Sequence, residues 1–103
     1  MLNEPHGHSS VYWQENILIL SLEGSFNLEG VINTNDKIKK LVSECSLENW
    51  YLMIKLAPET LLTADSIEEV TKVMKWLYEN NCQYVAYITE SNFYEDIIKN
   101  MFK

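Results

Sequence analysis

The segment Trp50–Leu56, which reads WYLMIKL, restricts the possible folds of this chain more than any other segment. Its side chains are almost all apolar, whereas a strand with one face in water alternates apolar and polar residues. A continuous apolar strand is typical of the middle of a parallel sheet, where both faces are covered. Pro58 ends the strand, because proline lacks the N–H group that a central strand needs. The segment therefore predicts a central, fully buried strand.

Six other segments have the pattern of a strand or a helix. Branched and apolar residues predict strands at 11–13, 17–22 and 83–89, and the first two are expected to pair as a hairpin. Apolar residues at helical spacing predict helices at about 27–45, at 65–79 and from 91 or 92 onward. Gly30 and residues 33–35 are weak helix formers, so the first helix could begin later than residue 27.

The predicted order of elements is therefore β-β-α-β-α-β-α. Strand–helix–strand units give parallel strand pairs joined by right-handed crossovers. We expect an α/β fold, with a small mixed sheet of about four strands and helices packed on it. Three helices could cover both faces of the sheet, or leave one face for a partner. Residues 1–10 are expected to form a flexible N-terminal tail and residues 11–103 a single domain.

Composition and charge exclude several classes of protein. The 103 residues are 47% hydrophobic with only 3 Gly and 2 Pro, which is enough apolar material for a packed core. Eight basic against 15 acidic residues give a net charge of −7, so we expect no binding to nucleic acid or to an anionic membrane surface. No apolar run approaches the roughly 18–20 residues of a membrane span, and no signal peptide is visible. We expect a soluble, cytoplasmic protein.

The sequence contains no recognisable catalytic or metal-binding motif. It has no glycine-rich phosphate loop and no nucleophile elbow, so we expect no catalytic residues, no cofactor and a non-enzymatic role. His6 and His8 lack further ligands at metal-binding spacing, and they are interpreted as part of the tail. Cys45 and Cys82 are too far apart in sequence for a local metal site and are expected to be reduced thiols.

Asp65 and Ser66 lie where a loop leads into the second predicted helix. Ser66, with Glu69 three residues later, matches a capping box, and Asp65 or Thr63 could cap the helix instead. A phosphate on Ser66 would meet the free N–H groups and the positive end of the helix dipole. The same position therefore supports two interpretations, a structural cap and a phosphorylation site.

The order of elements and this Asp-Ser pair resemble the STAS domains, the fold of the anti-sigma-factor antagonists, and in particular the stand-alone SpoIIAA-like group. The resemblance extends over residues 11–103 and is carried by the segments ILILSLEGSFN, WYLMIKLAPETLLTADS and NNCQYVAYITES. In regulatory STAS proteins, a serine that follows an aspartate at the start of the second helix is phosphorylated by a partner kinase, and Ser66 has the matching position. The regulatory pattern then continues with a small residue and a glycine, where this chain has Ile67 and Glu68.

The resemblance and the residues together lead to three functional hypotheses. The first is a regulatory protein-interaction module, whose contact surface is formed by Thr63, Asp65, Ser66, Glu68 and Glu69, and whose partner is a kinase or another regulator. The alternative is a carrier or sensor of an apolar, lipid-like ligand, which requires a cavity of roughly 300 Å³ or more between the sheet and a helix. The third is a homodimer whose association is structural.

Overall fold

The computed structural model describes residues 4–89, and within them it confirms an α/β fold built on a mixed sheet of four strands. The order across the sheet is β1-β2-β4-β6. The β1–β2 pair is antiparallel, and the β2–β4 and β4–β6 pairs are parallel. The strands are β1 His8–Gln14, β2 Ile17–Glu23, β4 Trp50–Leu56 and β6 Cys82–Thr89. The predicted final helix lies outside the described residues.

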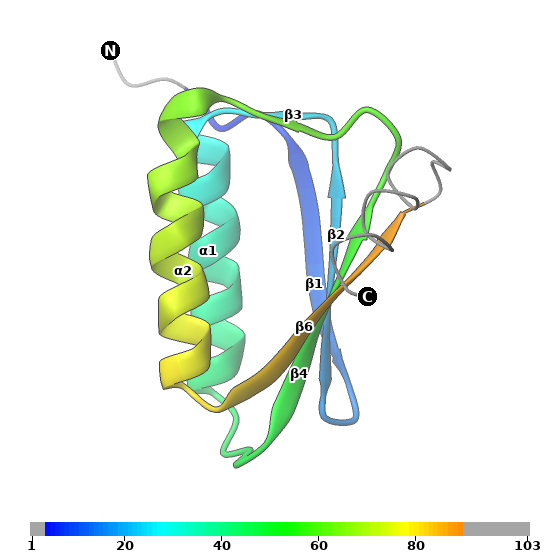
Figure 1. Ribbon diagram of the computed structural model, residues 1–103, viewed down its shortest axis with the longest axis vertical. Coiled ribbons are helices and arrows are strands. Elements are labelled where there is room, and N and C mark those ends of the chain that lie inside the picture. The colour runs from blue at the N-terminus through cyan, green and yellow to red at the C-terminus, as the bar shows by residue number, and fades with distance from the viewer. Residues whose placement is uncertain (1–3, 90–103) are drawn as a thin grey trace.

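Two helices, α1 (Leu28–Ser43) and α2 (Ile67–Glu79), pack on the same face of this sheet (Figure 1). The sequence of β4 predicted a strand buried on both faces, and this prediction was wrong: only one face is buried. Its burial alternates: Trp50, Leu52 and Ile54 face the helices, whereas Tyr51 and Lys55 are exposed on the other face. No helix or strand within residues 4–89 covers this other face, which we call the open face of the sheet. The rings of Tyr51 and Tyr84 stack on it with centroids 6.2 Å apart, although Ile19 on the same face is only 4% exposed.

Two very short strands that the sequence pattern did not predict form a second sheet. The strands β3 (Ser25–Phe26) and β5 (Leu61–Leu62) pair in parallel, and β3 runs across one end of the space between helices and sheet (Figure 1). A single turn of 3-10 helix, η1 (Ala64–Ser66), then leads into α2. Each short strand has only two residues, which is too few for a detectable period of hydrophobicity.

The hydrophobic core lies between the helix-facing side of the sheet and the two helices. Its buried members come from the sheet and from both helices. They include Leu18, Leu20, Trp50, Leu52 and Cys82 from strands, Ile38 from α1, and Val73 and Leu77 from α2. The indole N–H of Trp50 donates a hydrogen bond to the carbonyl oxygen of Asn80, 2.8 Å away, so the end of α2 is tied to the start of β4. No helix within residues 4–89 is long and apolar enough to cross a membrane.

The first strand begins three residues earlier than predicted, because His8, Ser9 and Ser10 pair with residues 21–23 of β2. These three residues were assigned to the N-terminal tail, but the structure places them in the sheet. The first helix begins where the sequence placed it, since Asn27 is its N-cap and the Asn27 side chain accepts a hydrogen bond from the Gly30 N–H. The domain therefore includes more of the N-terminus than hydrophobic patterning indicated.

Candidate functional site

Ser66, the predicted phosphorylation site, is completely buried, with 0% of its surface exposed. Its hydroxyl donates a hydrogen bond to the carbonyl oxygen of Thr63, 2.6 Å away, inside the single turn of η1. It occupies the N-cap position of α2, as predicted, but its side chain makes no capping hydrogen bond to the helix. The predicted capping box with Glu69 is therefore absent. A kinase could reach the Ser66 hydroxyl only if this turn first opened.

The other residues of the predicted contact surface lie near Ser66 and are accessible. Thr63, Asp65 and Glu68 are exposed, and Glu69 is half-buried. The hydroxyl of Thr63 donates to a carboxylate oxygen of Asp65, and Lys72 pairs with Glu69 at 3.2 Å and more distantly with Glu68. Such exposed ion pairs stabilise a protein very little.

Exposed apolar side chains lie beside these acidic residues. Ile67, which the helical pattern placed on the buried side of α2, is 57% exposed, and Leu61 and Leu62 of β5 are also exposed. The prediction for Ile67 was wrong because the turn that precedes α2 is a 3-10 turn, and the residues that reach the core from α2 begin only at Val70. The surface around 63–69 is therefore partly apolar and rimmed by carboxylates.

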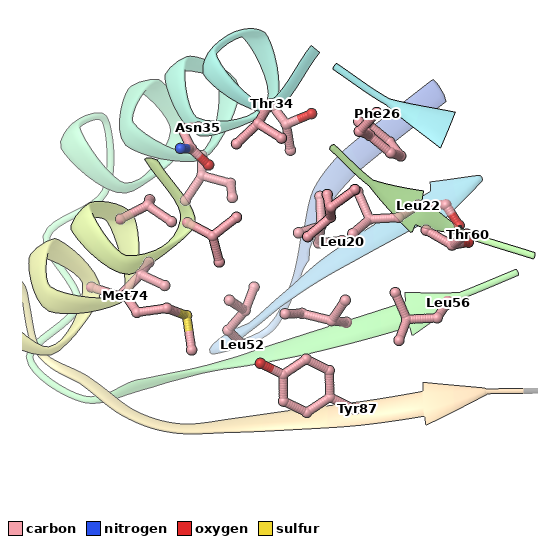
Figure 2. A pocket seen from close by; sticks show the side chains of 17 residues that line it. Leu20, Leu22, Phe26, Thr34, Asn35, Leu52, Leu56, Thr60, Met74 and Tyr87 are labelled. Carbon is pink, nitrogen blue, oxygen red and sulfur yellow. Dashed lines mark hydrogen bonds between the residues drawn. The ribbon is translucent and has the colours of Figure 1, made fainter. Parts of the chain in front are cut away.

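A cavity of about 280 Å³ lies between the sheet and the two helices, and we call it the central cavity (Figure 2). Thr34 and Asn35 reach it from α1, Met74 from α2, and Leu52 and Tyr87 from the sheet. The remaining lining residues are Leu20, Leu22, Phe26, Val31, Ile38, Ile54, Leu56, Thr60, Leu62, Val70, Val73 and Leu77. None of these 17 residues is charged. Because Leu62 is 46% exposed, the cavity reaches the surface beside β5.

Sequence patterns did not reveal the central cavity, although one indication was present. Thr34 and Asn35 looked like weak helix formers, yet both are buried, with 6% and 8% of their surface exposed. Asn35 lies four residues after Val31 and three before Ile38, so it shares the apolar stripe of α1. A polar residue within an apolar stripe is the kind of exception that can mark a binding site.

The wall formed by α1 is held firmly to the N-terminal part of the chain. The Asn27 side chain accepts from the N–H of His6 at 2.8 Å and donates to the carbonyl oxygen of Glu4 at 2.9 Å. Further along the helix, the side chains of Thr34 and Lys37 both hydrogen-bond to Ser9 of β1. The absence of a side chain at Gly30 is required here, because a Cβ would overlap the carbonyl oxygen of His6.

Two buried groups near the core have perturbed acidity. Burial raises the pKa of the Tyr87 hydroxyl at the wall of the central cavity, and the nearby Tyr78 raises it further. Burial also raises the pKa of the Cys82 thiol, while backbone hydrogen bonds at Leu52 and Tyr84 partly oppose this effect. Both groups therefore stay protonated at neutral pH, so neither adds a charge to the core.

The remaining candidate residues do not form a site in the described part of the chain. His6 and His8 are exposed, and among residues 4–89 no three His, Cys, Asp or Glu side chains lie together so that they could hold a metal ion. Cys45 and Cys82 are free thiols, the first half-buried and the second buried.

Comparison with known proteins found no similarity that identifies a family. No model of a known protein family matches the sequence, and a search of curated proteins found no match.

Proposed function

We propose that this protein binds a small apolar ligand in the central cavity and acts as a non-enzymatic carrier or sensor. The observation that supports this proposal is the volume of the cavity, about 280 Å³, together with its uncharged lining. This volume lies just below the roughly 300 Å³ that was required for such a site. Cavities in protein interiors are normally few and small, since cores pack as densely as organic crystals. An apolar cavity of about 150 Å³ is already large enough to bind benzene. The central cavity is large enough for a longer or branched hydrocarbon.

Binding can be tested with a neutral dye whose fluorescence rises in apolar surroundings, N-phenyl-1-naphthylamine. The substitution Val70→Phe places a ring in the central cavity, and Thr71→Phe places the same ring on the exposed face of α2. We expect the wild type and Thr71→Phe to bind the dye, and Val70→Phe to bind it at least about tenfold more weakly. Because the ring fills empty space, Val70→Phe should also avoid the cost of about 1–3 kcal/mol that overpacking a filled core brings.

Two results would contradict the proposal. One is dye binding that Val70→Phe does not weaken. The other is absence of binding to the wild type combined with binding to the full-length variant Ile97→Asp/Ile98→Asp. Residues 97 and 98 belong to the apolar sequence beyond the described part, so the second result would mean that the chain itself, and not a ligand, takes up the cavity.

A second proposal keeps the STAS-like interaction module, with Thr63, Asp65, Ser66, Glu68 and Glu69 as the contact surface. It is supported by the exposed apolar side chains of Leu61, Leu62 and Ile67 beside that surface, because protein contacts favour apolar centres with polar rims. In this proposal a kinase or other regulator is the partner, and phosphorylation of Ser66 accompanies opening of the η1 turn.

Peptide mass spectrometry on protein from its own source tests the phosphorylation step. A phosphate on Ser66 within the peptide of residues 56–72, absent from the Ser66→Ala variant, is the expected result. A peptide that stays unmodified under several growth conditions would contradict a phosphorylation switch, but it would leave the ligand proposal unaffected.

A third proposal, self-association, is supported by the open face of the sheet. Tyr12, Tyr84 and Ile88 are exposed there, at 48%, 72% and 45%. Sedimentation velocity should show a mass that rises with protein concentration, and Tyr84→Lys should abolish the rise, because a lysine ammonium is costly to bury between two copies. A wild-type mass that stays constant would exclude a dimer at the concentrations measured.

A further inference from the structure

Asn35 supplies the central cavity with a hydrogen-bond acceptor that no residue within the described range 4–89 uses. The side chain is 8% exposed, lines the cavity, and its Nδ2 group donates to the carbonyl oxygen of Glu69 in α2, 3.3 Å away. Because a carbonyl oxygen can only accept, this bond fixes the amide orientation and leaves Oδ1 on the opposite side, toward the cavity. Within residues 4–89 no group donates to Oδ1, and this oxygen keeps some accessible surface.

The other polar groups at the cavity wall offer little to an anion. The hydroxyl hydrogen of Thr60 is directed to the carbonyl oxygen of Ala57 at 2.7 Å, and that of Thr34 to Gly30 or Ser9 at 2.9 Å. No Lys, Arg or His lies among the 17 lining residues. Hydrogen-bond donors alone would not offset the cost of taking a carboxylate out of water without a cation.

We infer that the central cavity selects a neutral amphiphile, an apolar body that carries one hydrogen-bond donor such as an alcohol, and that it discriminates against the corresponding carboxylate. The donor would bond to Oδ1 of Asn35, and the hydrocarbon would lie against Leu52, Val73 and Met74. The inference rests on the proposed ligand-binding function and adds the chemical class of the ligand.

Three probes of similar length distinguish the contribution of the hydrogen-bond donor to affinity from the contribution of the apolar body. They are 1-octanol, its isomer 1-methoxyheptane, which has an oxygen but no donor, and octanoate. Each is titrated against the full-length protein with bound N-phenyl-1-naphthylamine at pH 7.5, and displacement is followed by fluorescence. One net hydrogen bond makes 1-octanol about three- to tenfold tighter than the ether. Octanoate should be at least about tenfold weaker than 1-octanol, because its charge must be desolvated.

The outcomes distinguish this inference from the proposed function. If the ether displaces the dye as well as the alcohol does, or if octanoate binds as tightly as either, the selectivity inference is wrong while ligand binding stands. If the dye itself does not bind, the proposed function has failed.

The variant Asn35→Leu tests the residue directly. It should reduce the preference for alcohol over ether to about one, while affinity for the ether stays the same or rises, because an apolar side chain replaces an unused acceptor. Asn33→Leu, on the exposed side of α1, is the matched control and should keep the wild-type preference. If Asn35→Leu does not fold, the ratio of alcohol to ether affinity in the wild type still tests whether the cavity selects a hydrogen-bond donor.

Discussion

The two helices lie on the same face of the sheet but are attached to the rest of the chain in different ways. The helix α1 contributes six buried residues and bonds through Asn27, Thr34 and Lys37 to the N-terminal residues. The helix α2 contributes only Val73 and Leu77 as buried residues. Its bonds to other elements lie near its ends, from Asn35 to Glu69 and from Trp50 to Asn80.

The difference indicates which wall of the central cavity can move. The middle of α2, which includes Val70 and Met74, borders the cavity, and its contact with α1 there includes Lys39, whose Nζ lies 5.7 Å from the centroid of the Trp76 ring. The difference in mobility is therefore inferred from the number of buried residues, six in α1 against two in α2. Segments with few buried contacts open at the lowest free energy. We therefore expect a ligand to enter by displacement of α2 while α1 stays in place.

The largest loss of stability is expected on substitution of Ser66, the buried residue that directly precedes α2. Ser66→Asp places a carboxylate at a position with 0% exposure, and urea unfolding should show a loss of at least about 3 kcal/mol. Ser66→Ala removes only the hydrogen bond to Thr63 and should cost about 1 kcal/mol. If Ser66→Asp is as stable as the wild type, the turn opens easily, and Ser66 is more available to a kinase than its burial indicates.

The attachment of α2 by its few buried residues can be tested at Leu77. Leu77→Ala should lower the free energy of unfolding by about 2–5 kcal/mol, because a side chain with 1% exposure leaves a cavity behind. Ile67→Ala, at the exposed start of the same helix, should change it by less than about 1 kcal/mol. Comparable losses for the two variants, measured by chemical denaturation, would mean that α2 is anchored along its whole length.

The packing of the N-terminal segment on β3, the strand that leads into α1, can be tested at Gly7. This residue has φ of 97°, and a Cβ there would overlap the ring of Phe26, whereas Gly24 has φ of 89° with nothing near its Cβ position. Gly7→Ala should therefore destabilise the protein by about 1–3 kcal/mol more than Gly24→Ala, since only Gly7 carries the overpacking cost. Equal losses of stability would show that the segment around Gly7 can move away from Phe26 at little cost, and that its packing on β3 is loose.

The smallest expected change in stability comes from raising the pH, through the buried thiol of Cys82. Because burial raises its pKa above the ordinary value of 9.0, the folded protein keeps the proton to higher pH than the unfolded chain does. The stabilisation is present below pH 9 and is lost as pH rises through the folded pKa, and Tyr87 acts in the same direction. Unfolding at pH 7.5 and 10 should show this decline, and Cys82→Ala should make it shallower. An identical decline in Cys82→Ala would exclude a contribution from the thiol.

The sequence predicted the large elements well, because their hydrophobic patterns are long enough to read. The bounds of β4 are those predicted, and β2 extends only one residue further. Residue type and position before an apolar stripe allow Asn27 or Ser25 as the cap of the first helix, and the structure has Asn27 there. Where local preference and tertiary packing favour the same structure, a single sequence is sufficient.

The site was harder to predict, for two physical reasons. The exposure of Ile67 and the burial of Ser66 both depend on a 3-10 turn whose register differs from that of the helix after it. The central cavity is a gap among residues from strands, helices and loops, and periodicity shows which side chains point inward but not whether they fill the space. The capping box predicted for Ser66 and Glu69 is absent for the first reason, and the preference for a surface site over a cavity followed from the second.

The parallel pairing of β2 with β4 also has a kinetic consequence. Leu18 pairs with Leu52, and each later pair in this ladder keeps the same separation of 34 residues along the chain, whereas the β1–β2 hairpin closes across a two-residue turn. Contacts between distant residues form more slowly, because the loop between them must close before it is stabilised. We therefore expect the hairpin and α1 to form early, and the β2–β4 ladder to limit the folding rate.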